Sequence, residues 1–440
     1  MRFIFAPRTY LLLVMGILPL IFYGIFPQVA YGVAAFDILV LAIAFIDYFQ
    51  SRREVHQLSI ERIIKQRPGI GEEITVRLQI ENKSDRAFKL IIKDEYPPEF
   101  TLLTEREFRL TARPGEVMEA SYKISSPRRG KFEFGKTAVR HLSRWQMIYC
   151  QYSIDNQEQV TVYPSTKRIR ELQYSAIGNR IFLTTKPKMR LRGEGREFES
   201  LRDYITGDDF RHISWTATAK RSKLTTRQFQ IEKDQSIIIA LDAGRLMTQT
   251  INGETKFETA LHCSLALASA ASAAGDNVGF LVFCRYILNF IPPGRGNRHL
   301  EAIIKSMAEL EPELVEPSYL RMLRFASTNV KKRSLIIIIT DIVDDVSSKE
   351  LITSLKLIRP RHLPLIVAIA DRDLRAVVSE IPKTIPDLFL QSTAEELLAK
   401  RQLALSKIEI LGGHVLDVTT ASLAAKLVDA YLDIKRRGAL

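Results

Sequence analysis

Two aspartates, Asp242 and Asp341, each end a continuous apolar run and are the residues best placed for metal chemistry. The ends of neighbouring parallel strands meet at one edge of a sheet, and carboxylate oxygens there suit Mg²⁺. The residues after Asp242 are Ala, Gly and Arg, so they supply no further oxygen ligand and put the Arg245 cation beside the carboxylate. We therefore predict that Asp242 pairs with Arg245 or caps the following turn. A divalent-metal site is kept as the weaker hypothesis.

A second candidate is the stretch 193–229, which combines dense charge with five aromatic residues. A solvated charge run rarely carries so many large apolar side chains, and a buried segment rarely carries so many Arg and Asp. We predict that its aromatic residues pack against a domain core while its charges form ion pairs or meet a partner. The residues predicted to bind a partner or to hold the structure are Glu197, Arg202, Tyr204, Asp208, Asp209, Arg211 and Trp215.

No catalytic set is apparent, so we predict that the protein is not an enzyme. Phosphate-loop, nucleophile-elbow and zinc-protease motifs are missing, and the seven histidines are dispersed. An uncharacterised hydrolase, with Asp208 and His212 in its pocket, is the alternative. The three cysteines have no metal or disulfide spacing and are expected to be small buried hydrophobes in a reducing compartment.

The net charge of +13 suits nucleic acid, anionic lipid or an acidic protein. Nucleic acid is disfavoured, because no motif is present and acidic residues interrupt the basic ones. Anionic lipid accounts more simply for basic residues near a membrane segment.

The first 53 residues are predicted to form a transmembrane hairpin. Residues 10–26 and 29–49 are two apolar spans, each just long enough to cross a bilayer, with Arg before the first and after the second. By the positive-inside rule both ends are cytoplasmic, which gives a multi-pass protein of the inner cell membrane with cytoplasmic soluble domains. Asp37 is expected to face a partner helix or water, or to lie near the outer interface. A cleaved signal peptide is the weaker alternative, because no cleavage site ends the first span.

The rest of the chain is predicted to form two domains joined by a linker. Residues 54–165 contain short alternating runs, at 74–80, 88–92, 118–124 and 160–162, which are typical of an all-β sandwich. Residues 166–234 form a linker together with the charged aromatic stretch. Residues 235–440 alternate apolar strands with helices, which predicts a doubly wound, Rossmann-type parallel sheet.

The charged aromatic stretch resembles the signature of the bacterial domain-of-unknown-function family 58. The residues that match in order are Gly193, Gly195, Glu197, Phe198, Leu201, Arg202, Tyr204, Gly207, Asp208, Asp209, Arg211, Ile213, Trp215, Ala217, Ala219 and Leu224. The resemblance extends to residues 292–296 and to the end of the chain, and the predicted hairpin and β module fit the family layout.

This resemblance implies a von Willebrand factor A-like domain on a membrane anchor, working as a scaffold for a MoxR-type AAA+ ATPase in the assembly or maturation of other complexes. The fold's metal site begins Asp-x-Ser-x-Ser, whereas residues 242–246 are Asp-Ala-Gly-Arg-Leu. This departure from the motif argues against metal-dependent partner binding, and we therefore predict no cofactor. A Mg²⁺-dependent binding module, with a site rebuilt from Asp242 and Asp341, is the alternative.

Overall fold

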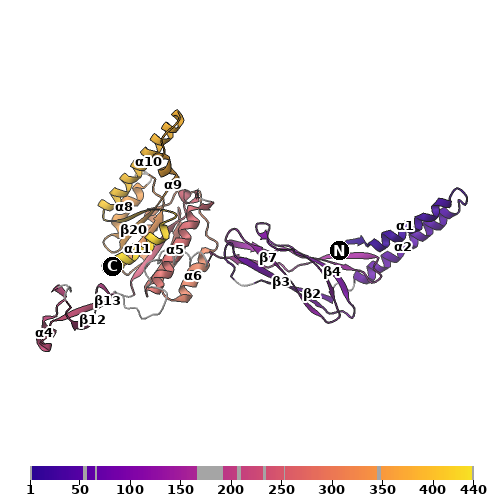
Figure 1. Ribbon diagram of the computed structural model, residues 1–440, viewed down its shortest axis with the longest axis horizontal. Helices are drawn as coiled ribbons and strands as arrows, with labels where there is room; N and C mark the ends of the chain where they lie inside the picture. Colours follow the sequence, from indigo (N-terminus) through magenta and orange to yellow (C-terminus); the bar gives the residue numbers. More distant parts are fainter. Residues whose placement is uncertain are drawn as a thin grey trace. The chain divides into compact units, whose positions relative to one another are not determined.

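The computed structural model describes residues 2–52, 57–64, 67–165, 192–205, 210–230, 234–251, 253–343 and 348–438. The chain divides into two compact units, Met1–Pro164 and Ser165–Leu440. Figure 1 shows the elements of both.

The first unit has apolar helices near its N-terminus, of which one is long enough to cross a membrane. Helix α2 (Val29–Arg52) has 24 residues, and an 18-residue stretch within it has a mean hydropathy of 2.4. The apolar helix before it is shorter, because α1 (Pro7–Ile17) tightens into the 3₁₀ turn η1 (Leu18–Phe22) at Pro19, which has no backbone N–H to donate. A two-span hairpin is therefore not confirmed. Asp37 of α2 lies against Gly16 of α1, where a Cβ atom would come within 2.6 Å of the carboxylate.

A β-sandwich follows, with a five-stranded sheet in the order β1-β10-β9-β4-β6, a four-stranded sheet in the order β2-β3-β7-β5, and the pair β11-β8. The strands are β1 (Arg2–Phe5), β2 (Leu58–Ile64), β3 (Glu73–Asn82), β4 (Phe88–Asp94), β5 (Thr101–Leu102), β6 (Glu107–Ala112), β7 (Val117–Ser125), β8 (Gly130–Glu133), β9 (Thr137–Leu142), β10 (Ile148–Ile154) and β11 (Gln159–Val162). The four runs singled out in the sequence lie in β3, β4, β7 and β11.

A buried charge network ties the two larger sheets together. Arg62 of β2 donates to both oxygens of Asp94 of β4, at 3.0 and 2.6 Å. Tyr122 of β7 and Thr137 of β9 each donate to the same carboxylate at 2.6 Å. Because every partner comes from a different strand, the network fixes how the sheets pack.

Helix α2 is fastened to the sandwich. The carboxylate of Asp47, near the end of α2, accepts hydrogen bonds from the Ser143 hydroxyl and the Trp145 backbone N–H. The strand β1, which the sequence did not suggest, pairs with β10. Helix α2, β1 and the sandwich therefore belong to one packed unit.

The second unit is built on a six-stranded sheet in the order β18-β17-β14-β19-β20-β21, in which β18 is antiparallel and the other five are parallel. The strands are β14 (Ser236–Asp242), β17 (Asn277–Phe283), β18 (Ile287–Gly294), β19 (Ser334–Thr340), β20 (Leu363–Ala370) and β21 (His414–Thr419). Two short strands, β15 (Thr250–Ile251) and β16 (Glu254–Thr255), form a separate pair after the 3₁₀ turn η4 (Arg245–Thr248).

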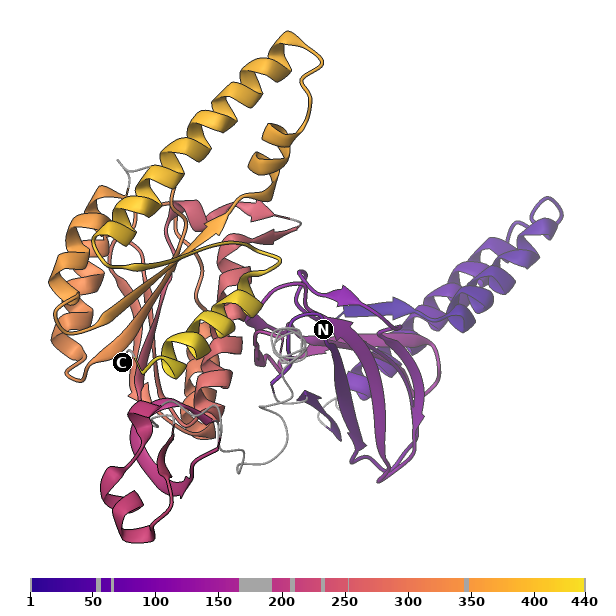
Figure 2. The same ribbon diagram turned by 60° about the vertical axis from the view of Figure 1, so that its left-hand side comes forward.

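Helices cover both faces of this sheet (Figure 2). Alternate residues of β14 point to opposite layers, and all of them are buried, which explains the unbroken apolar run. The helices packed on one face are α5 (Lys256–Ala273), α6 (Asn297–Met307) and α11 (Leu423–Arg436). Those on the other face are α7 (Tyr319–Asn329), α8 (Lys349–Ile358) and α10 (Ile385–Ile410), and α9 (Arg372–Ser379) precedes α10.

The charged aromatic stretch forms a hairpin of its own. Strand β12 (Arg192–Asp203) pairs with β13 (Thr225–Gln230), and between them lie the 3₁₀ turn η3 (Phe210–His212) and helix α4 (Trp215–Arg221). We call residues 192–230 the arm.

Candidate functional site

Asp242 lies at the carboxyl edge of the sheet, where the strand order reverses between β14 and β19. It is buried; one of its oxygens accepts from the Gly244 backbone N–H at 2.7 Å and the other from the Thr340 hydroxyl at 2.6 Å. Burial raises the pKa of Asp242 to about 7, and these hydrogen bonds oppose the rise. The predicted turn cap is confirmed. The predicted pairing with Arg245 is wrong, because Arg245 reaches Glu316 at 2.7 Å instead.

Asp341, one residue past β19, is held by two buried cations. Lys256 at the start of α5 binds one carboxylate oxygen at 2.6 Å, and Arg401 of α10 binds the other at 2.8 Å. Arg401 also reaches Asp417 of β21 at 2.9 Å. The cluster therefore ties α5 and α10 to the ends of two strands, and its charges balance within the domain.

These contacts decide how well the edge suits a divalent cation. Both oxygens of Asp242 accept from protein donors, and both oxygens of Asp341 face a cationic nitrogen. Within the described ranges, no group of three or more His, Cys, Asp or Glu side chains is arranged to hold a metal ion. A metal would have to displace the Lys256 ammonium, so the residues as placed do not fit one.

A small cavity of about 110 Å³ lies above this cluster. Its charged and polar lining comes from Gln249, Lys256, Asp341, Asp371 and Arg401, and apolar side chains of α9 and α10 close it. The space is equivalent to about four waters, at roughly 30 Å³ each. It suits solvent or one small side chain and offers no nucleophile beside a base.

The arm exposes the aromatic residues that we expected to be packed. Trp215, which begins α4, is 68% exposed, and Phe210 is 72% exposed. Tyr204 stacks on Phe210, with ring centroids 5.8 Å apart, instead of packing on a domain core. The aromatic residues had suggested core packing because the sequence did not show that the stretch folds back on itself as a separate hairpin.

The other residues predicted in this stretch are distributed along the arm. Arg202 is half-buried and donates to the Asp203 carbonyl at 3.3 Å. Glu197 lies on β12, opposite Gln230, and Arg211 lies in η3. Asp208 and Asp209 lie outside the described residues.

Three residues of the carboxyl edge were missed in the sequence: Lys256, Thr340 and Arg401. Lys256 and Arg401 are 85 and 60 residues from Asp341 along the chain. Each lies in a helical run whose neighbours gave no sign of a buried charge. Thr340 adjoins Asp341 and was treated as the last residue of an apolar strand, although a hydroxyl beside two strand-end carboxylates is a usable signal.

Comparison with known proteins finds a family model that matches part of the second unit. Residues 200–383 match the family described as "Protein of unknown function DUF58". The match covers residues 200–230 of the arm and the strands from β14 to β20, which is less than half of the chain, and over these residues it supports a likeness to DUF58. No curated protein matches the chain.

Solved structures with partial likeness are distant. Native alpha-2-macroglobulin from Escherichia coli has 17% identity and a TM-score of 0.22, covering 24% of this chain and 16% of its own. A FixG-related protein from Vibrio parahaemolyticus has 11% identity and a TM-score of 0.17, covering 24% and 96%. Proximal thread matrix protein 1 from the mussel byssus has 11% identity and a TM-score of 0.28, covering 47% and 46%. Likenesses this weak carry no functional argument.

Proposed function

We propose that this protein is a membrane-anchored, non-enzymatic scaffold. It binds protein partners through its α/β unit and works with a MoxR-type AAA+ ATPase in the assembly or maturation of other complexes. The observation that carries the proposal is the exposure of Trp215 and Phe210 on the arm. Exposed large aromatic residues are typical anchors of protein interfaces.

The anchor of this scaffold is the apolar helix α2, with the shorter helix α1 packed beside it. We propose that the pair inserts in the inner membrane with both soluble units in the cytoplasm. The fastening of Asp47 to the sandwich supports a rigid connection between the membrane helix and the first soluble unit.

The α/β unit is proposed to be a distant von Willebrand factor A-like domain that acts without a metal. The antiparallel edge strand β18 on an otherwise parallel sheet supports the likeness of fold. The hydrogen bonds and ion pairs of Asp242 and Asp341 weigh against the Mg²⁺-dependent alternative, since Lys256 already supplies positive charge there.

The proposal is tested by binding between the purified chain, in neutral nanodiscs, and a MoxR-type ATPase from the same organism. Trp215→Ala is expected to weaken binding by about tenfold or more, the loss typical of an interface anchor. Phe389→Ala on α10 is the matched control, because Phe389 is 71% exposed and belongs to a helix outside the arm. No binding to the ATPase, or equal loss in both variants, would refute the role of the arm.

A further inference from the structure

The solvent face of the five-stranded sheet carries a ring of cations that the scaffold role does not explain. On β4, Lys89, Ile91 and Lys93 point outward, while the residues between them are buried. Ile91 lies opposite Arg109 of β6 on one side and opposite Arg140 of β9 on the other. Neighbours along a strand on one face are about 7 Å apart, and adjacent strands are about 4.8 Å apart. Four cations therefore surround one apolar side chain; we call Lys89, Lys93, Arg109 and Arg140 the basic face.

The charge of the basic face is largely uncompensated. Arg109 is 80% exposed and lies 3.6 Å from Glu107, so the two form only a weak, solvated ion pair. Glu107 is the only carboxylate of β4, β6 or β9 on this face of the sheet. Arg140 donates to the uncharged Gln151 at 3.0 Å. Lys89 and Lys93 form no ion pair with any residue that the structure describes. Four cations against one carboxylate leave a net charge of three.

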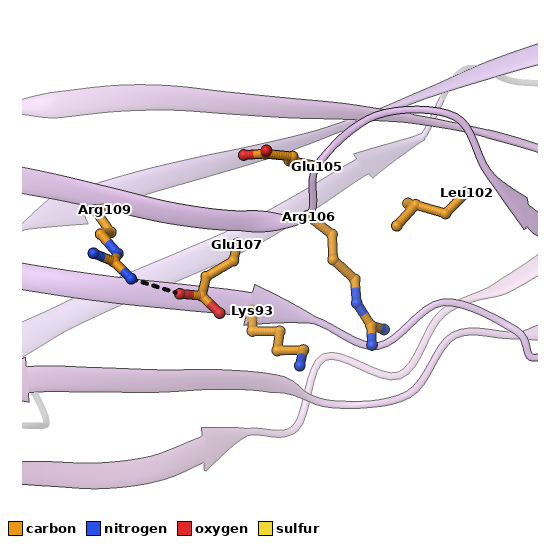
Figure 3. A pocket seen from close by; sticks show the side chains of 6 residues that line it. All are labelled: Lys93, Leu102, Glu105, Arg106, Glu107 and Arg109. Carbon is orange, nitrogen blue, oxygen red and sulfur yellow. Dashed lines mark ion pairs between the residues drawn. The ribbon is translucent and has the colours of Figure 1, made fainter.

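A cleft of about 610 Å³ continues the basic face at the Lys93 end of β4 (Figure 3). Its lining residues are Lys93, Leu102, Glu105, Arg106, Glu107 and Arg109. Arg106 is oriented by the Tyr96 ring, 4.9 Å from its guanidinium carbon, and by a 3.3 Å hydrogen bond to the Asp94 carbonyl. The cleft therefore holds a positioned guanidinium.

The cleft also borders an exposed sheet edge. Strand β6 is the edge strand of its sheet and pairs only with β4 among the described strands. An edge strand leaves backbone donors and acceptors available to a further strand.

We propose that the basic face and its cleft dock an extended, acidic segment of a protein partner. The segment's backbone lies along β6, and its carboxylates meet Lys93, Arg106 and Arg109. This surface belongs to the first unit and is separate from the arm, so the inference goes beyond the proposed function and does not depend on it.

Protein suits this surface better than the anionic membrane to which the chain is anchored. The C-terminal part of helix α2 contacts the turn between β9 and β10, because Asp47 accepts a hydrogen bond from Ser143 of that turn. Arg140 lies three residues from Ser143, which is about 10 Å along a strand, and Lys93 lies opposite Ala138, further away. Charges in solution are screened within about 8 Å at physiological salt, so lipid headgroups beyond α2 act weakly on most of this face.

The test measures the affinity of a labelled oligoglutamate peptide for the full chain in neutral nanodiscs, by fluorescence anisotropy. Lys93→Gln/Arg109→Gln is expected to weaken binding by about tenfold and to reduce its salt dependence. Lys83→Gln/Arg128→Gln is the control: it removes the same charge from two exposed side chains that do not line the cleft, and a change under about twofold is expected.

Two results would overturn the inference. One is an equal loss of affinity in both double variants, which would show a general effect of net charge. The other is that the Lys93/Arg109 variant loses binding to phosphatidylserine vesicles but binds the peptide as the wild type does, which would assign the face to lipid. Trp215→Ala is expected to leave peptide binding unchanged, so failure here and failure of the arm's role are distinguishable.

Discussion

The buried carboxylate of Asp242 makes the stability of the α/β unit depend on pH in a way that one substitution should remove. Burial raises its pKa from 3.8 to about 7. The folded chain therefore keeps a proton that the unfolded chain releases. This contribution is complete below about pH 4 and is lost as the pH rises through about 7. Asp242→Asn keeps the shape and both hydrogen bonds, since the amide can accept from Gly244 and donate to the Thr340 oxygen.

The size of the effect follows from the pKa. A rise of about three units corresponds to about 4 kcal/mol at about 1.4 kcal/mol per unit, which is the full cost of ionising Asp242 inside the fold. Asp242→Asn avoids this cost, but it recovers only part of these roughly 4 kcal/mol, about 2 kcal/mol, because an amide makes weaker hydrogen bonds than a carboxylate does. We expect Asp242→Asn to raise the free energy of unfolding by about 2 kcal/mol at about pH 8 and to change it by less than about 1 kcal/mol at about pH 5.

Hydrogen exchange of peptides from β14, followed by mass spectrometry on the full chain in detergent, reports on this unit alone. The wild type should lose protection of β14 between about pH 5 and about pH 8, after correction for intrinsic exchange, and Asp242→Asn should not. If Asp242→Asn is less protected than the wild type at the higher pH, the carboxylate is needed in its charged form and the reasoning fails. Adding Mg²⁺ to the wild type gives a second check, because a rise in protection would show that Asp242 serves a metal.

Two further predictions concern the other buried charges. Lys256→Met should destabilise the α/β unit by about 3 kcal/mol, because it leaves Asp341 with one cation. Adding Asp341→Asn should recover at least half of that loss, measured as the protection of β19 against hydrogen exchange. If the second substitution restores no protection, packing and not charge is responsible. Arg62→Met should destabilise the sandwich by about 3 to 5 kcal/mol, because it leaves the buried carboxylate of Asp94 without its cation. Lys123→Gln, at an exposed ion pair, should cost under about 1 kcal/mol. Similar rates of hydrogen exchange in β4 of the two variants would contradict the role of the buried network.

Local patterns in the sequence predicted much of the second unit. The apolar runs that form β14 and β19 are buried on both faces of the sheet, which is why their central residues are all apolar. The first charged residue after each run, Asp242 or Asp341, therefore indicated where the strand ends. The turn cap by Asp242 was predictable because it spans only two residues.

What failed depended on distant partners. The exposure of Trp215 depends on the arm's folding as a hairpin, whose strands pair residues such as Phe198 and Phe229 far apart in sequence. The cations around Asp341 come from other helices, so no spacing rule connects them. The hairpin of two membrane spans is not confirmed, because the helix before α2 tightens at Pro19, a backbone effect that a composition count ignores.

The most direct test of the scaffold proposal is affinity capture of the full chain from native membranes, with quantitative mass spectrometry. The wild type and Phe389→Ala should each recover an AAA+ ATPase of the MoxR type well above a mock capture, and Trp215→Ala should recover far less. Absence of any AAA+ ATPase from the wild-type capture, or equal recovery with Trp215→Ala, would contradict the account.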